Sequence, residues 1–258
     1  MIVFFVAEEF KSEIDWITNV IFDQFLGLDY CVELFDDKEH FKIVLGKHEI
    51  SIVNTFLLNA NKNWLKIDSI PRQSLQTINL TNYFETSFFN SQLPIIFGKP
   101  TISRSTDVTI IGFDIIGTIF FILSGYEDAV KKEADRHARL PFKSTITSEF
   151  SLITRPIVDE YIDLLWTIIL EIEPSLCRKE RSSKVSISCD VDVPYSFYVK
   201  SFWPTIRTVG GDLIKRKSLP SAIQTITNFV MSKLNIYFFD PVNKFDWMMD
   251  VNESFGHR

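Results

Sequence analysis

Two carboxylates stand one residue apart at the end of a short apolar run, in the stretch KVSISCDVDVP at 184–194. In an extended strand successive side chains point to opposite faces, so Asp190 and Asp192 would share one face. Like charges this close repel unless solvent, a cation or a shared proton separates them. The pair therefore predicts either a metal or general-base site at a strand end, or a solvated strand end that runs into a turn at Pro194.

Composition favours a folded protein that does not bind nucleic acid. The hydrophobic content of 46% and the 24 phenylalanines predict a large core, and 258 residues suffice for one large domain or two smaller ones. The formal net charge is −6, and the basic clusters at 177–184 and 215–217 fit a linker and a helix end better than a phosphate-binding surface. The three cysteines form neither a disulfide framework nor a metal-ligand motif.

No segment has the length and charge pattern of a membrane span or of a secretory leader. The opening apolar run, IVFFVA, has six residues, lacks a basic region before it and is followed by acids. The apolar helix pattern that begins at 114 is short and is bounded by Asp114, Glu127 and Asp128. We therefore expect a cytoplasmic protein without a membrane span.

Hydrophobic spacing predicts strands and helices in the order of an α/β protein. Strands are expected at 2–7, 93–98 and 107–114, a β-hairpin at 40–54, and helices at 12–28, 114–135 and 155–174. Asp114 stands where a helix N-cap is expected, and Pro156 stands where a helix tolerates a missing N–H group. Residues 60–92 lack a strong period and are expected to be mostly loop, with a short strand within 63–71.

The charged, serine-containing stretch EPSLCRKERSSK interrupts the periodicity and predicts a domain boundary. We expect an α/β domain at residues 1–176, a linker at 177–183 and a second domain at 184–258. In the second domain, the strand with the paired acids precedes three helical patterns, at 196–216, 220–235 and 243–255.

The paired acids also carry a family resemblance. SCDVDVP at 188–194, followed by DPVNKFDWMMDVNESFGHR at 240–258, resembles the polysaccharide deacetylases, the family 4 carbohydrate esterases with a NodB-like distorted (β/α) barrel. Many relatives have His-Asp-Val-Asp-His where this chain has Cys-Asp-Val-Asp-Val at 189–193, so Cys189 and Val193 stand in the places of the two histidines. Upstream, LPIIFG, GFDIIGTIFFILSGYED, DRHARLPFKST and RPIVDEYIDLL are similar to the accessory domain that precedes such deacetylase domains in bacterial surface-polysaccharide loci. The resemblance implies a mixed α/β accessory domain followed by the first part of a deacetylase barrel.

The resemblance also implies an activity, the metal-dependent removal of acetyl groups from a surface or cell-wall glycan with zinc or a similar divalent ion. Asp190 would be the general base and Asp192 the metal ligand, although family members also show the reverse assignment. The family's later His-x-x-x-His motif is missing, because none of the four histidines, at 40, 48, 137 and 257, lies four residues from another. We therefore expect an incomplete deacetylase domain that has no activity by itself.

The polar triplet Asp135, His137 and Arg139 forms a second candidate site, with Arg155 as a further member. These side chains could contact a glycan or the neighbouring domain, or the triplet could be a structural clamp within a loop.

The alternative to an enzyme part is a non-catalytic α/β module that binds a carbohydrate or a glycan-assembly protein. A Rossmann-like nucleotide site ranks last, because its glycine fingerprint is missing.

Overall fold

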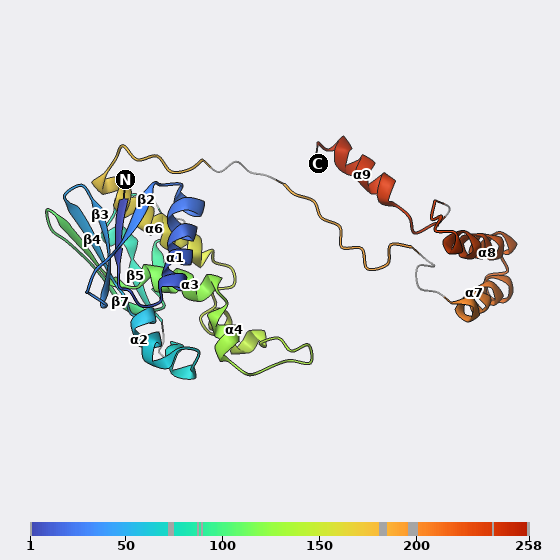
Figure 1. Cartoon of the computed structure of the whole chain (residues 1–258), viewed down its shortest axis with the longest axis horizontal. Coiled ribbons are helices and arrows are strands. Elements are labelled where there is room, and N and C mark those ends of the chain that lie inside the picture. Colours follow the sequence, from blue (N-terminus) through green and yellow to red (C-terminus); the bar gives the residue numbers. More distant parts are fainter. Residues whose placement is uncertain are drawn as a thin grey trace. The chain divides into compact units, whose positions relative to one another are not determined.

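The computed structural model describes residues 2–71, 75–86, 88, 90–180, 185–195, 201–238 and 240–256. Its contacts divide the chain between residues 180 and 181 into two units, which we call unit 1 and unit 2 (Figure 1). The predicted linker at 177–183 spans this division. Residues 181–184, which include the predicted start of the second domain, lie outside the described residues.

Within its described residues, unit 1 is built on a six-stranded sheet with the order β2-β1-β3-β4-β8-β7. The strands are β1 (Ile2–Val6), β2 (Tyr30–Leu34), β3 (His40–Leu45), β4 (His48–Val53), β7 (Gly98–Arg104) and β8 (Val108–Phe113). The pairs β1–β2 and β4–β8 are parallel, and the other neighbours are antiparallel. The α/β class is confirmed, and the predicted strands at 2–7 and 107–114 and the hairpin at 40–54 are present.

One face of this sheet is packed against helices. Figure 1 shows α1 (Lys11–Thr18), α3 (Ile115–Leu123) and α6 (Ile157–Ile172) on the same side of the strands. Every second side chain of β1 and β3 is buried, because strand side chains point alternately to the two faces. Phe4 of β1 lies between Phe22 and Phe41, with ring centroids 5.6 and 5.8 Å away. The phenylalanine-rich composition thus fills the layer between sheet and helices.

The predicted long helices form, but two of them differ in detail. The helix predicted at 12–28 consists of α1 and a π-helical continuation, η1 (Asn19–Leu26), which ends at Gly27 with a positive φ of 64°. The helix predicted at 114–135 ends as α3 at Leu123, because Gly125 takes a φ of 62° and interrupts it. A short α4 (Tyr126–Val130) follows. The helix at 155–174 is confirmed as α6.

The prediction of mostly loop at 60–92 missed several short elements. This region contains the end of α2 (Phe56–Asn63), the 3₁₀ turns η2 (Ile67–Ser69) and η3 (Leu80–Asn82), and the strand β5 (Gln76–Asn79), which pairs with β6 (Gln92–Ile95). A 3₁₀ turn occupies the place of the short strand expected within 63–71. Strands β2 and β7 were also not predicted. A single turn η4 (Phe142–Ser144) and a short α5 (Ile146–Glu149) lead into α6.

Unit 2 contains the helices α7 (Phe202–Ile214), α8 (Leu219–Lys233) and α9 (Phe245–Ser254), near the three predicted helical patterns. Residues 196–200, at the start of the first pattern, are outside the described residues. The prediction of a strand that carries the paired acids was wrong, since residues 185–195 are irregular and 185–193 are exposed. A strand needs a hydrogen-bonded neighbour, and the described residues of unit 2 supply none. Among the described residues, no helix is long and apolar enough to cross a membrane.

Tyr161 fixes α6 to the strand β6. Its hydroxyl is fully buried, donates to Pro94 O at 2.8 Å and accepts from Ile96 N at 3.4 Å. We expect Tyr161→Phe to lower the free energy of unfolding by about 1–3 kcal/mol, because both backbone groups lose their buried partner. Tyr83→Phe, at a half-buried tyrosine of the same unit, is the control. Equal urea midpoints for the two variants would contradict this assignment.

Candidate functional site

The paired acids do not form a metal centre within the described residues. Asp190 and Asp192 are both exposed on the irregular segment that opens unit 2. No group of three or more His, Cys, Asp or Glu side chains that could hold a metal exists in the described part of the chain. Zinc usually takes four ligands from a protein, or three and a water, so the residues present do not fit a metal site. The roles given to these two acids remain predictions.

The histidines are engaged elsewhere. His40 lies 3.1 Å from Asp37, and His48 lies 3.0 Å from the hydroxyl of Thr109, both within unit 1. His137 accepts a hydrogen bond from its neighbour Arg136 at 2.9 Å. His257 lies outside the described residues. Each described histidine therefore has a local partner in unit 1.

The turn at 135–139 has the geometry of a loop clamp. The carboxylate of Asp135 accepts from the backbone N–H groups of His137 and Arg139 at 2.7 and 3.1 Å, and from the Arg139 side chain at 3.3 Å. The hydrogen bond from the Arg139 N–H, together with the others, lowers the pKa of Asp135 below its usual value. Arg155 has other partners, since it pairs with Glu160 and donates to Gln92 O at 2.8 Å. These contacts favour the structural interpretation of the triplet.

A different carboxylate organises the carboxyl ends of the parallel strands β4 and β8. Asp114 directly follows β8 and is completely buried. Its Oδ2 accepts from the N–H groups of Thr55 and Phe56 at 2.9 and 2.8 Å, where α2 begins, and its Oδ1 accepts from Gly117 N at 2.6 Å in the first turn of α3. One side chain therefore caps two helices, only one of which was expected from the sequence.

The same residue also binds the connection between β6 and β7. The backbone N–H of Asp114 donates to Phe97 O at 3.0 Å. Gly117 must lack a side chain here, because a Cβ atom would lie 2.4 Å from Asp114 Oδ2 and 2.7 Å from the Cβ of Phe56. Gly98, with a φ of 97°, approaches Gly112 so closely that a Cβ would lie 2.6 Å from its carbonyl oxygen. The chain is thus tightly fixed around Asp114.

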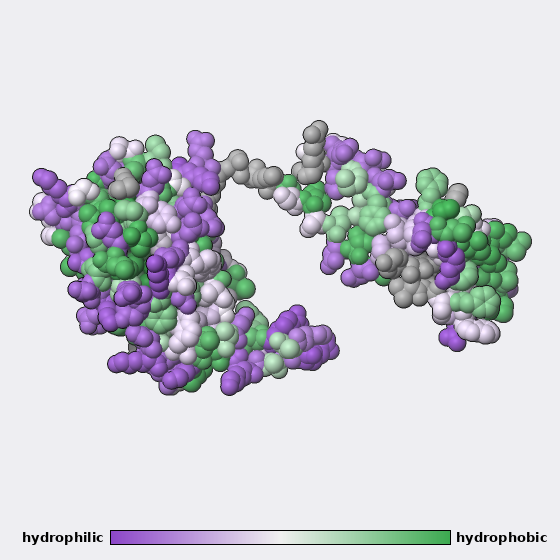
Figure 2. Space-filling model, in the orientation of Figure 1, coloured by the Kyte–Doolittle hydropathy of each residue, from purple (hydrophilic) through white to green (hydrophobic). Residues whose placement is uncertain are grey.

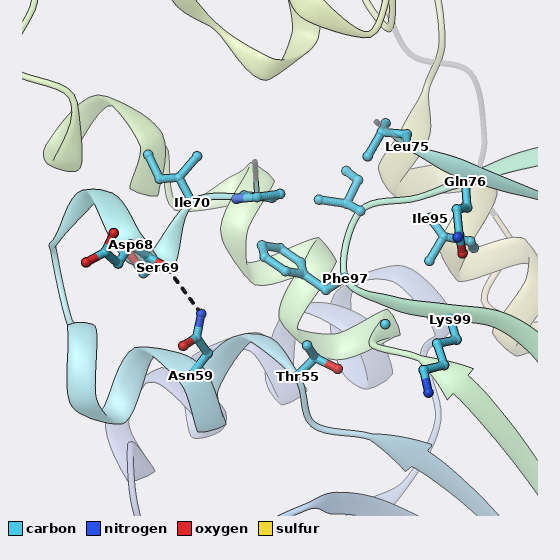
Figure 3. Close-up of a pocket in the computed structure, with 13 residues that line it drawn as sticks. Thr55, Asn59, Asp68, Ser69, Ile70, Leu75, Gln76, Ile95, Phe97 and Lys99 are labelled. Atoms are coloured by element: carbon cyan, nitrogen blue, oxygen red, sulfur yellow. Dashed lines mark hydrogen bonds between the residues drawn. The ribbon is translucent and has the colours of Figure 1, made fainter. Parts of the chain in front are cut away.

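A cleft of about 550 Å³ opens beside this cap, which is a volume typical of small-ligand sites. Figure 3 shows Asp68, Ser69 and Asn59 on one side, Gln76 and Lys99 on the other, and Phe97 between them. Asn59 donates to Asp68 O at 3.4 Å across the first wall. The cleft lies outside the carboxyl ends of β4 and β8, where open α/β sheets commonly bind ligands. The apolar lining residues include Ile70, Leu75 and Ile95.

A second hollow of about 530 Å³ lies at the opposite end of the sheet. It is bordered by the β3–β4 and β7–β8 turns, and an ion pair of 2.9 Å between Arg104 and Glu171 closes part of it. The hairpin turns at the amino end of this parallel pair offer no helix start, whereas the first turns of α2 line the first cleft through Thr55 and Asn59. We therefore take the cleft beside Asp114 as the candidate site. It was not predicted from the sequence, because the wall formed by Asp68–Pro71, Leu75 and Gln76 lies in the region that was expected to be mostly loop.

These features define unit 1 as a mixed α/β domain with a cleft at the carboxyl ends of its parallel strands β4 and β8. The chain belongs to the family of unknown function DUF7033, whose model matches residues 2–174. The match covers the sheet, the cleft and α6, and it ends before unit 2. Neither the curated proteins nor the solved structures contain a match to the chain.

The pKa of Asp114 gives a test of the double cap. Burial raises this pKa from 3.8 to about 6, against the opposing effect of the three backbone hydrogen bonds. The folded state then binds the proton more tightly than the unfolded state. The stabilisation from this group is complete below about pH 3.8 and is lost as the pH rises through about 6, a change of about 3 kcal/mol.

We expect Asp114→Asn to remove this part of the pH dependence and to lower the free energy of unfolding at pH 7 by about 1–3 kcal/mol. Above its pKa of about 6 the wild-type carboxylate accepts from all three N–H groups, whereas the amide NH₂ would face a backbone donor. Urea unfolding at several pH values measures both effects. The exposed Asp107→Asn serves as the matched control. A variant that keeps the full wild-type slope between about pH 4 and 6.5 would show that Asp114 is not the group responsible.

Proposed function

We propose that the chain is part of a polysaccharide deacetylase-like protein in which unit 1 is a non-catalytic, carbohydrate-binding module. The observation that carries this proposal is the cleft of about 550 Å³ beside the Asp114 cap. The resemblance of residues 188–194 and 240–258 to deacetylases supplies the glycan context. The family match, which is of unknown function, adds no activity of its own.

The lining of the cleft suits a saccharide. A sugar ring presents hydroxyl groups around its edge and C–H groups on its faces, so its site needs both donors and acceptors and an apolar surface. Asn59, Gln76 and Thr55 supply amide and hydroxyl groups that can both donate and accept. Ile70 and Phe97 supply the apolar part. Among these lining groups the polar side chains fix the orientation of the ligand, and the apolar ones contribute buried area.

The geometry supports binding more than turnover at this cleft. The buried carboxylate next to it, Asp114, is occupied by three backbone N–H groups and is therefore not free to take a proton from a substrate. Its role is to hold the starts of α2 and α3 in place. A rigid frame of this kind lowers the cost of ordering the site when a ligand binds.

Unit 2 is proposed to be the deacetylase-like segment, with a NodB-like barrel as the fold to which it belongs. In that setting Asp190 is the proposed general base and Asp192 the proposed ligand of zinc or a similar ion, with the reverse assignment still open. Within the described residues the two acids stand alone, and we assign no hydrolytic step to them. A cytoplasmic location and contacts with glycan-assembly proteins also remain proposals.

Saccharide binding is tested by calorimetry with a panel that includes acetylated chitooligosaccharides. We expect Gln76→Ala and Lys99→Ala to weaken binding by about tenfold each, which corresponds to about 1.4 kcal/mol. Lys47→Ala removes the same charge at the opposite hollow and should bind like the wild type. Wild-type affinity in both cleft variants would exclude this cleft as the site, and failure of the wild type with every saccharide would refute the carbohydrate proposal.

The proposal also predicts that the 258-residue chain does not deacetylate chitooligosaccharide, with or without added zinc. Acetate release and zinc content are measured for the wild type, Asp190→Ala and Asp192→Ala. We expect all three to match the blank, because one or two exposed carboxylates do not make a zinc site. Acetate release that disappears in Asp190→Ala would overturn this assignment and make unit 2 an active enzyme.

A further inference from the structure

The helices α7 and α8 of unit 2 pack together through polar residues. Thr205, Asp212 and Asn228 are buried, with exposed fractions of 5% or less. Asp212 accepts from Thr225 Oγ1 and from Arg216 Nη1, both at 2.8 Å. The inner seam of this helical hairpin is therefore formed by small and polar side chains, including Ala222, and the Thr225–Asp212 hydrogen bond joins the two helices. Most of the large apolar side chains of α7 and α8 are not buried in this seam.

Those apolar side chains are exposed and regularly spaced. On α8, Leu219, Ile223, Ile226 and Val230 follow one another at intervals of four, three and four residues, and each is about half exposed or more. On α7, the exposed Phe202, Ile206 and Leu213 repeat the same spacing together with the half-buried Val209. Intervals of three and four place side chains in one stripe along a helix, as in the seams of packed helices.

Figure 2 shows that apolar side chains gather over α7 and α8 as a continuous surface. Exposed patches of this kind mark interaction sites, because water-exposed apolar area favours burial against a partner. The surface is defined here by the two stripes, on 202–213 and on 219–230.

Basic and acidic side chains lie on different helices of unit 2, and this distribution indicates a partner for the apolar surface. Residues 202–233 contain five basic side chains and one acid, Asp212. The helix α9, at 245–254, contains three acids and no basic residue. None of its residues is buried, and its Trp247 and Met249 are 63% and 60% exposed. An acidic helix with exposed apolar residues is complementary to a basic hairpin with exposed apolar stripes.

We propose that unit 2 is a homodimerisation surface, in which α9 of one copy covers the α7–α8 stripes of a second copy and the second copy does the same in return. A two-fold axis makes such a contact self-complementary and closed. The apolar residues form the buried centre of this interface, and the acids of α9 face the basic residues at its rim. The inference is independent of the proposed carbohydrate site in unit 1.

Sedimentation equilibrium of the full chain over a concentration series tests the dimer. We expect a monomer–dimer equilibrium for the wild type and a dissociation constant raised at least about tenfold in Ile226→Glu. Gln224→Glu adds the same charge at an exposed position two residues away on α8 and should dimerise like the wild type. Circular dichroism confirms that both variants keep their helices.

A second comparison tests the role of α9. Asp250→Lys should raise the dissociation constant of the dimer and make that constant less sensitive to salt. Asp36→Lys in unit 1 should change neither the dissociation constant nor its dependence on salt. A wild-type chain that stays monomeric overturns the proposal, and so does a dimer that tolerates Ile226→Glu or Asp250→Lys. A monomer that co-sediments with anionic lipid vesicles would also overturn it and would assign the stripes to a membrane surface.

Discussion

The structure of unit 1 depends on the hydrogen bonds of one buried carboxylate. Asp114 holds the first turns of α2 and α3 through three backbone N–H groups, and its own N–H binds the β6–β7 connection. Burial disfavours the charged form and raises the pKa of this group to about 6, whereas the three hydrogen bonds favour the charged form and act to lower the pKa. The buried carboxylate, with its desolvation cost, therefore lies where two parallel strands and two helices meet.

The position of the candidate cleft follows from this cap. Because α2 starts at the end of β4 and α3 starts at the end of β8, their amino-terminal turns lie at one edge of the sheet, and residues 95–99 run between them and β5. Gly98 and Gly117 allow the close approaches that this arrangement requires. A ligand that enters the cleft meets walls that are already held in place, which is why binding is the function proposed for unit 1.

Much of this fold could be predicted from the sequence, but the site could not. The alternation of Ile2, Phe4 and Val6 and the spacing along α6 specify buried faces locally, so the strand and the helix were recovered. Asp114 was found as a helix cap because capping is also local. Its second set of contacts, to Thr55 and Phe56, spans almost sixty residues and depends on the pairing of β4 with β8. The strands β2, β5 and β7, and with β5 one wall of the cleft, were missed for the same reason.

The paired acids show the opposite failure, in which a short alternating pattern predicted a strand that is not there. An isolated run such as 185–191 has the period of a strand, but nothing local supplies the neighbour whose N–H and C=O groups would complete it. The deacetylase resemblance, which begins in this segment, therefore remains a proposal about unit 2. The family relationship through residues 2–174 concerns unit 1 alone.

The most direct test of the central claim is an NMR titration of the isotope-labelled chain with acetylated chitooligosaccharide. We expect the amide signals of Asn59, Gln76 and Gly98 to shift together in a saturable manner, while those of residues 185–195 do not move. Shifts confined to residues outside the cleft, or signals unchanged throughout the titration, would contradict the claim that the Asp114-supported cleft binds carbohydrate.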